Sequence, residues 1–304
     1  MPYDLLVILG PTACGKTKLA AQLAYRLDGE IISADSRQVY RRMDLGTGKD
    51  LSDYYVHGKH IPAHLIDIAE PGDEYNVYTF QRDFAAAVSA IESRKKFPIL
   101  CGGTGMYLES VVEDYEFLEV PYDDAQRKMW DTMSVEDLIG HLVALRPLHA
   151  TTDITQRERL YRALEIAQFQ QDHPRDSQSI KKLKPLLVGV HMDRSLLRNR
   201  ITQRLRERID GGMIDEVRRL LEEGVPEERF IAYGLEYKYV VRFLRGELDQ
   251  ERMFTLLNTA IHQFAKRQMT WYRRMERKGH PIHWIDGTQD EEEKVSQVLK
   301  FLKT

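Results

Sequence analysis

The chain has 304 residues, of which 42% are hydrophobic and 30% charged, so it can bury the core of one large domain or of a core with a smaller second domain. Its two cysteines, Cys14 and Cys101, exclude a disulfide framework and lack the paired spacing of a zinc site, which favours a reducing compartment. The net charge of −3 does not exclude a polyanionic partner, because residues 194–208 carry six arginines against the single acid Glu207.

The opening stretch "MPYDLLVILG" contains the first predicted strand. Leu5 to Leu9 form a continuous apolar run that ends at Gly10, which is typical of a strand buried on both faces of a parallel sheet. No cationic segment precedes the run, no cleavage site follows it, and it is too short to cross a membrane. We therefore expect a cytoplasmic protein with no membrane partner.

The motif "GPTACGKT" follows this run and precedes a predicted helix that starts near Lys16. It fits the phosphate-binding pattern G-x-x-x-x-G-K-[ST], and a strand before it and a helix after it are the context that supports such a match. Its glycines let backbone amides point at phosphate oxygens, Lys16 adds a positive charge, and Thr17 can hold Mg²⁺. The predicted diphosphate- or nucleotide-binding set is Gly10, Pro11, Thr12, Ala13, Cys14, Gly15, Lys16 and Thr17.

Three further apolar runs begin at Glu30, Phe97 and Pro185, and each ends in a polar or glycine-rich turn. Helical stretches such as "YTFQRDFAAAVSAIESRKK" separate them, which predicts βαβ units with ligands at the carboxyl ends of the strands. The segment that includes "RERLYRALEIAQF" has no convincing strand. We predict an α/β fold, namely a P-loop NTPase-like core with a mainly parallel sheet flanked by helices. Residues 1–112 form the first part of this core, and residues 113–185 form a small helical insertion domain. Residues 186–304 complete the core and add a helical C-terminal region.

The motif alone predicts that the protein binds a phosphate group, but it does not indicate which reaction the protein catalyses. A kinase also needs a base for its acceptor and usually a lid of arginines, and a GTPase needs a guanine-reading element. The sequence has no "NKxD", and its strands end in "SADSRQVY" and "CGGTG" without an obvious Walker-B carboxylate. A P-loop kinase or an ATP-dependent RNA-binding module remains an alternative, which ATP hydrolysis stimulated by RNA would favour.

Four separated blocks together resemble the tRNA dimethylallyltransferases, also called tRNA isopentenylpyrophosphate transferases. They are "DSRQVYRRMDLGTGK" from Asp35, "HLIDIAEPGDEYNVYTF" from His64, "GGTGMYL" from Gly102 and "FAKRQMTWYRR" from Phe264. The resemblance implies that the loop binds the diphosphate of dimethylallyl diphosphate as a leaving group, while the five-carbon group moves to the N6 amine of the adenine 3′-adjacent to the anticodon. An adenylate isopentenyltransferase acting on free AMP, ADP or ATP is the related alternative, for which the helical insertion and the arginine-rich segment would have no purpose.

The resemblance also implies three catalytic residues. Asp35 matches the base that takes a proton from the amine, which needs one because its lone pair is delocalised into the ring. Thr104 matches a position beside the diphosphate, and Arg204 matches an arginine that reaches it; together with Lys16 and Mg²⁺ they would stabilise the growing charge. From the residues alone, Asp35 could instead cap a helix, and Thr104 could belong to a tight turn without a ligand.

For tRNA, the target base must leave the anticodon stack before it can react. The resemblance assigns "DSRQ" to the extruded nucleotide, where Gln38 suits a base edge and Arg37 suits phosphate or stacking. The block "ERLYRALE" carries Glu158 where the family usually has glutamine, and a solvated helix face is the alternative for its arginines. The predicted tRNA-binding set is Asp35, Ser36, Arg37, Gln38, Glu158, Arg159, Leu160, Tyr161, Arg162, Lys266 and Arg267.

Arg200, Arg204 and Arg208 recur every four residues and therefore share one helix face. Arg208 stands where the family usually has methionine and is available to face RNA, or it pairs with an acid of this chain such as Glu207, Asp210 or Glu216. The expected partners are tRNA, through its anticodon stem-loop, and dimethylallyl diphosphate, with Mg²⁺ as the cofactor and a monomeric enzyme.

Two remaining groups of residues have competing explanations. Trp271 and Tyr272 lie among basic residues and could stack on unpaired bases or belong to the core. His57, His60 and His64 lack the nearby thiols or carboxylate spacing of a metal site, so surface roles are favoured.

Overall fold

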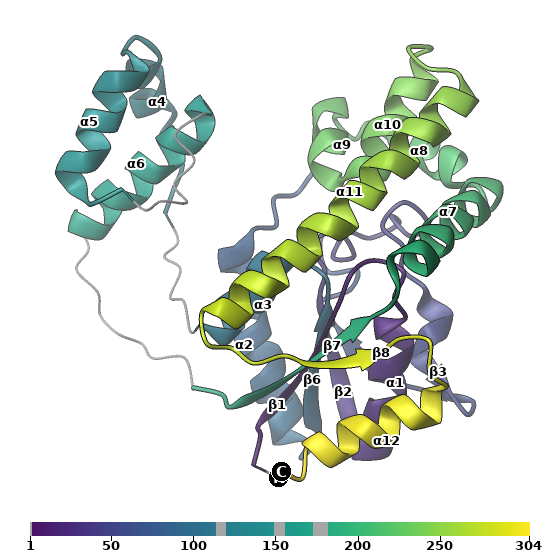
Figure 1. The fold of residues 1–304 in the computed structure, drawn as a ribbon. Coiled ribbons are helices and arrows are strands. Elements are labelled where there is room, and N and C mark those ends of the chain that lie inside the picture. The colour runs from purple at the N-terminus through teal and green to yellow at the C-terminus, as the bar shows by residue number, and fades with distance from the viewer. Residues whose placement is uncertain (1, 114–119, 149–155, 173–181) are drawn as a thin grey trace. The chain divides into compact units, whose positions relative to one another are not determined.

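The computed structural model describes residues 2–113, 120–148, 156–172 and 182–304 (Figure 1). The chain forms two compact units, Met1–Tyr115 with Lys182–Thr304, and Glu116–Lys181. The larger unit is built on a β-sheet and the smaller one on helices (Figure 1). In the part of the chain that the structure describes, no helix is long and apolar enough to cross a membrane.

A six-stranded sheet in the order β5-β2-β6-β1-β7-β8 forms the centre of the larger unit. Every neighbouring pair in it is parallel, which confirms the predicted α/β fold with a mainly parallel sheet. A separate antiparallel pair, β3 with β4, follows a short 3₁₀ turn at Leu51–Tyr54. The strands are β1 Leu5–Leu9, β2 Gly29–Ala34, β3 Tyr55–Val56, β4 Lys59–His60, β5 Ala63–His64, β6 Phe97–Gly102, β7 Pro185–His191 and β8 His283–Asp286.

Both faces of the sheet are covered, so its central strands are apolar on both sides. In β1, Leu6 and Ile8 pack into a core that includes side chains of α1, α7, α8 and α10, whereas Leu5, Val7 and Leu9 pack into one with side chains of α2 and α3. The helices of this unit are α1 Lys16–Leu27, α2 Val77–Ser93, α3 Gly105–Val112, α7 Arg194–Asp210, α8 Met213–Glu222, α9 Glu227–Tyr233, α10 Leu235–Leu244, α11 Gln250–Arg277 and α12 Glu291–Phe301.

The register of the central strands brings three strand ends to the same level. Leu9 of β1 and Ala34 of β2 both pair with Gly102 of β6. The segments that follow these strands, including the glycine-rich motif, therefore leave the carboxyl edge of the sheet together. This edge is where parallel α/β proteins place their ligands.

The 28-residue helix α11 crosses the larger unit and contacts α7 and α10 along one part and α3 along another (Figure 1). Asp249 caps its first turn by accepting a hydrogen bond from the backbone N–H of Arg252. Its buried positions include Ile261, Gln268 and Tyr272, so one long helix side faces the protein while the opposite side is polar.

The smaller unit contains α4 Asp124–Asp131, α5 Val135–Leu145 and α6 Arg157–Asp172, with no strand among its described residues. Asp123 and Ser134 cap α4 and α5 with side-chain oxygens. Trp130, Leu138 and Leu160 lie in its apolar core. This unit therefore has a core of its own.

A buried carboxylate on β2 should make the stability of the larger unit dependent on acid pH. Glu30, 5% exposed, accepts hydrogen bonds from Arg94 Nε at 3.0 Å and from His64 Nε2 at 2.7 Å. Arg94, and less strongly His64, hold the pKa of Glu30 below its usual value in spite of its burial. Because the pKa is lower in the folded state, the ionised carboxylate stabilises the fold above the unfolded pKa, and this contribution is lost as the pH falls.

We expect Glu30→Gln to lower the free energy of unfolding at pH 7 and to flatten its decline between about pH 5 and pH 3. Urea unfolding at a series of pH values measures both effects. Glu222→Gln, at an exposed position on α8, is the control for a general change of charge. A Glu30→Gln protein with the pH profile of the wild type would contradict this role.

Candidate active site

The glycine-rich motif forms a loop between β1 and α1 and exposes the amino end of that helix. Gly15, the residue before α1, has φ 89°, and Ala13 and Gly10 also have positive φ. No side chain in the described part of the protein caps α1, so its first N–H groups keep the capacity to bind an anion. Lys16 Nζ donates to the carbonyl of Pro11 at 2.7 Å, which holds the ammonium over the loop.

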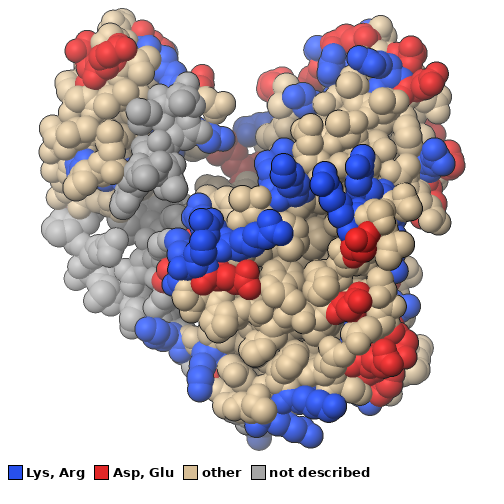
Figure 2. All heavy atoms as spheres, in the orientation of Figure 1, with Lys and Arg blue, Asp and Glu red and all other residues tan. Residues whose placement is uncertain are grey.

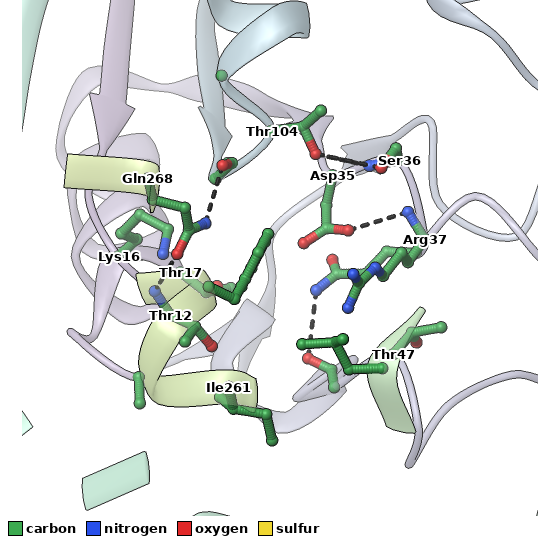
Figure 3. Close-up of a pocket in the computed structure, with 18 of the residues that line it drawn as sticks. Thr12, Lys16, Thr17, Asp35, Ser36, Arg37, Thr47, Thr104, Ile261 and Gln268 are labelled. Atoms are coloured by element: carbon green, nitrogen blue, oxygen red, sulfur yellow. Dashed lines mark hydrogen bonds between the residues drawn. The ribbon is translucent and has the colours of Figure 1, made fainter. Parts of the chain in front are cut away.

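A second turn joins the ends of β2 and β6. Thr104 donates its backbone N–H to Ala34 O at 3.1 Å, and its Oγ1 accepts from the N–H of Ser36 at 3.0 Å (Figure 3). A Cβ at Gly102 would lie 2.2 Å from Ala34 O, so this close approach of two backbones requires glycine. The turn thus places the Thr104 hydroxyl next to the segment that starts at Asp35.

Asp35 follows β2 and faces the same cavity. Its Oδ1 accepts from the backbone N–H of Arg37 at 3.0 Å, which fixes the carboxylate relative to the turn (Figure 3). Residues 36–39 form a turn, not the start of an α-helix, so Asp35 is not a helix cap. Arg37 is itself held, because its guanidinium lies 5.1 Å from the ring centroid of Phe264 and 3.2 Å from Glu236 Oε2.

Helix α11 connects the two loops through the amide of Gln268 and the hydroxyl of Tyr272, which lies 3.3 Å from Gly103 O as well as near Gly10 O. Gln268, 7% exposed, accepts from the backbone N–H of Thr12 at 2.9 Å and donates to Gly103 O at 2.8 Å (Figure 3). Tyr272, fully buried, donates to Gly10 O at 3.0 Å. Tyr272 therefore belongs to the core, and Gln268 is a site residue that the sequence analysis missed.

A third loop, residues 44–50, is held by a buried carboxylate of α8. Glu216 accepts from the backbone N–H groups of Asp44, Leu45 and Gly46 at 2.8, 2.8 and 3.0 Å, and from Tyr237 OH at 2.7 Å. Burial raises the pKa of Tyr237 well above its usual value, so its hydroxyl remains a donor. Glu216 is therefore committed to this loop and does not neutralise the arginines of α7.

The end of this loop contacts two predicted site residues. Gly48 O accepts from Gln38 Nε2 at 3.2 Å and from Arg204 Nη2 at 3.3 Å. Arg204 also forms an ion pair with Asp50. The backbone of the loop thus orients both an amide and a guanidinium toward the cavity.

A cavity of about 390 Å³ lies between these loops, α7 and α11. Its lining contains polar groups, among them the loop lysine, and the apolar side chains Ile261, Phe264 and Trp271, all three from α11. Figure 3 shows Lys16 and Ile261 among the lining residues. Eleven of the predicted site residues line it together: Thr12, Ala13, Lys16, Thr17, Asp35, Ser36, Arg37, Gln38, Thr104, Arg204 and Arg267. Such a cavity can hold a molecule with an anionic end and an apolar end.

Of the remaining predicted residues, Gly10, Pro11, Cys14 and Gly15 belong to the glycine-rich loop itself, whereas the others lie on α6 and α11. On α6, Leu160 is fully buried and Tyr161 is 5% exposed, so both support the core of the smaller unit and do not offer a surface to RNA. Arg162 donates to Glu165 and to Val120 O. Glu158 and Arg159 lie on the same helix, outside the buried core, while Lys266 is exposed on α11.

Arg208 is withdrawn from the surface, whereas the sequence left open that it faces RNA or pairs with an acid of this chain. Its side chain is 13% exposed and lines the cavity beside Arg204. Among the described residues, no group of three or more histidine, cysteine or carboxylate side chains could hold a metal ion, and His64 pairs with Glu30.

The bridge made by Gln268 generates a direct prediction. Gln268→Leu keeps the approximate size of the side chain but leaves the N–H of Thr12 and the carbonyl of Gly103 without this partner. We expect a loss of about 1–3 kcal/mol in the free energy of unfolding and a weaker affinity for inorganic diphosphate, because the N–H of Thr12 loses its partner and the hydroxyl of Tyr272 alone then bridges the two loops. Chemical unfolding and isothermal titration calorimetry measure these effects, and wild-type values for both would contradict the role of the bridge.

Comparisons with known proteins agree with this arrangement. The sequence model described as IPP transferase matches residues 38–275, and one described as isopentenyl transferase matches residues 3–59. A protein of Bacteroides fragilis named tRNA dimethylallyltransferase 2 is 51% identical over 301 residues, which cover 99% of this chain and 98% of the relative. A protein of Pelobacter propionicus with the same name is 54% identical over 287 residues, or 94% of this chain and 90% of the relative.

Solved structures support the same relationship. The full-length tRNA isopentenylpyrophosphate transferase of Bacillus halodurans aligns with a TM-score of 0.72 and 30% identity, over 99% of this chain and 96% of its own. A eukaryotic dimethylallyltransferase acting on tRNA shares the fold, with a TM-score of 0.80 at 22% identity over 98% of this chain and 79% of its own. With more than half of its length matched by the family model and relatives at 50% identity or more along nearly all of it, the chain belongs to the IPP transferase family.

Proposed function

We propose that this protein is a tRNA dimethylallyltransferase. It transfers the dimethylallyl group of dimethylallyl diphosphate to the exocyclic N6 amine of the adenine 3′-adjacent to the anticodon and releases diphosphate. The names of its relatives support this proposal and do not favour an adenylate isopentenyltransferase or a kinase. The observation that carries it is one cavity in which a carboxylate, Asp35, accompanies a phosphate-binding loop and an apolar wall.

The anionic end of the donor binds at the glycine-rich loop. The N–H groups at the start of α1 and the ammonium of Lys16 surround the diphosphate, and Arg204 of α7 and the Thr104 hydroxyl approach it from other parts of the cavity. As the carbon–oxygen bond breaks, negative charge increases on the departing oxygen. Positive groups that are already in place stabilise this charge without reorganisation.

The dimethylallyl chain lies against the apolar wall that Ile261, Phe264 and Trp271 provide. These side chains exclude water, which would otherwise compete with the amine for the reactive carbon. The polar and apolar groups of the cavity thus orient the donor. The carbon bonded to the diphosphate lies between the glycine-rich loop and Asp35.

Asp35 accepts the proton of the adenine amine. Its Oδ1 is held by the N–H of Arg37, and in the described part of the chain its Oδ2 has no hydrogen-bond partner, so this oxygen is available to the amine. The proton moves to Asp35 as the N6–carbon bond forms, which keeps the nitrogen from retaining a positive charge. Gln38 and Ser36 lie next to Asp35 in the cavity and contact the extruded base.

The residues near the loop fit a bound Mg²⁺. The hydroxyl of Thr17 and the carboxylate of Asp53 line an adjoining hollow of the same region, and Mg²⁺ combines one or two such oxygens with substrate phosphates and water. When bound, the ion would neutralise charge on the diphosphate. Thr17 and Asp53 are the residues that would hold it.

The tRNA backbone follows a band of exposed basic side chains on α7 and α11 (Figure 2). Such a band provides the sequence-independent part of RNA affinity, while the base is read in the cavity. Glu158 and Arg159 of α6 provide a further contact to the anticodon stem-loop. The band consists of Arg194, Arg198, Arg200, Lys266, Arg267, Arg273 and Arg277.

We propose that the enzyme acts as a monomer in the cytoplasm.

Asp35→Asn tests the catalytic step. Asparagine keeps the acceptor for the N–H of Arg37 but cannot take a proton, so we expect kcat to fall roughly a hundredfold or more while tRNA binding is unchanged. The assay combines dimethylallyl diphosphate, Mg²⁺ and an anticodon stem-loop, with mass analysis of the nucleosides. Asp290→Asn, at the remote cap of α12, is the control, and a near-normal kcat for Asp35→Asn would remove Asp35 from its role.

The basic band is tested by its salt dependence. The double variant Lys266→Gln with Arg267→Gln should raise the Kd for the stem-loop and reduce the slope of log Kd against log salt by about 0.7 for each phosphate contact that is lost. Lys300→Gln with Lys303→Gln removes the same charge from α12 and the residues after it and should leave the slope unaltered. An unchanged slope for the first pair would contradict RNA contact on α11.

A further inference from the structure

A second guanidinium lies beside Arg204 in the cavity and has no assigned role. Arg208 is one helical turn further along α7, so the two side chains lie on the same face of the helix. Arg208 lines both the main cavity and the adjoining hollow, and Lys16 and Thr17 of the phosphate-binding loop line both as well. Its position therefore differs from that of the exposed arginines on α7.

Within the protein this guanidinium is poorly neutralised. It makes no hydrogen bond to any residue that the structure describes, and Asp50 is its ion-pair partner there, with Oδ1 4.0 Å from Nη2. The same carboxylate forms a closer ion pair with Arg204. Glu207 accepts from Gln203, and Glu216 is used by the loop at residues 44–46, so neither acid satisfies Arg208.

The electrostatic environment of Arg208 is unfavourable for a cation in the absence of an anion. Burial, followed by the like charge of Arg204, lowers the pKa of Arg208 to about 10, against the opposing effect of Glu236, Asp50 and Asp35. A buried charge that is incompletely paired costs stability, and an arriving anion would remove this cost. Such an arrangement is typical of a binding site and not of a residue kept for packing.

The loop beside Arg208 is shaped to admit its guanidinium. Gly48 has φ +72°, and a Cβ there would lie 1.8 Å from Arg208 Nη2. Any side chain at this position would therefore displace the guanidinium. The carbonyl of the same glycine accepts from Arg204, so one backbone segment positions both arginines.

We propose that Arg208 binds the diphosphate together with Arg204, and that Asp50 is the internal anion that the diphosphate displaces from this pair of arginines. The proposal rests on the proposed function, because it assigns a further cation to the same leaving group. A diphosphate presents more oxygens than Lys16 and one arginine can engage, and planar guanidinium groups match phosphate oxygens in pairs. Asp50 keeps the two like charges together until the ligand arrives.

The test measures the affinity for inorganic diphosphate with Mg²⁺ by isothermal titration calorimetry. Arg208→Met should raise the Kd roughly ten- to a hundredfold, as expected for the loss of a charge-assisted hydrogen bond. Arg208→Lys, which keeps a positive charge, should recover part of this loss. Arg206→Met is the matched control, since Arg206 is exposed on the same helix, stacks over Phe254 and lines neither hollow.

Asp50→Asn provides a second measurement with the opposite sign. Removal of the competing carboxylate should lower the Kd for diphosphate. This gain in affinity should be smaller when Asp50→Asn is introduced into the Arg208→Met protein. Because Asp50 also pairs with Arg204, a role of Arg208 in packing alone would leave the gain from Asp50→Asn unchanged when Arg208→Met is added. If Arg208→Met does not fold, the Kd of Arg208→Lys and its change on addition of Asp50→Asn decide the question.

The proposal is overturned if Arg208→Met is folded and binds diphosphate like the wild type, or if both Asp50→Asn and Arg208→Lys leave the affinity unchanged. These experiments use neither the prenyl donor nor tRNA. A wild-type protein that binds diphosphate as described but does not prenylate an anticodon stem-loop would refute the proposed function and leave the role of Arg208 intact.

Discussion

The active cavity depends on the hydrogen bonds that Gln268 makes to two loops at the carboxyl edge of the sheet. One loop carries Lys16 and would hold a diphosphate, and the other ends at Thr104, which contacts the segment of Asp35. Transfer of an alkyl group needs the leaving group and the base at a fixed separation, because the carbon–oxygen bond breaks as the carbon–nitrogen bond forms and the base takes the proton of the attacking amine. A buried amide on a long helix provides this constraint.

The larger unit adds features that a phosphate-binding loop alone does not have. Glu216 fixes the turn at residues 44–46, and that turn presents Gly48 to the guanidiniums of Arg204 and Arg208. A backbone segment between strands would thus control the charge above a bound diphosphate. Phosphoryl transfer would need a different set of parts, whereas a leaving diphosphate needs this concentration of positive groups around it.

The sequence could predict the parts of the fold that carry strong local patterns. Apolar runs identified β1, β2, β6 and β7, but β5 has two residues and the edge strand β8 has four, too short for a recognisable pattern. Gln268 lies among basic residues and resembles an exposed position, since its burial depends on loops more than 160 residues away. The burial of Arg208 likewise depends on Gly48, a contact that no local pattern encodes.

The central claim is that the enzyme breaks the carbon–oxygen bond of dimethylallyl diphosphate and not a phosphorus–oxygen bond. One labelled substrate tests this claim most directly. Dimethylallyl diphosphate with ¹⁸O at the oxygen that joins carbon to phosphorus is incubated with Mg²⁺, the wild-type protein and an anticodon stem-loop. The account predicts that all of the ¹⁸O leaves in diphosphate, in an amount equal to the five-carbon groups gained by adenine. Recovery of the label in dimethylallyl alcohol, or of phosphate on the RNA, would contradict it.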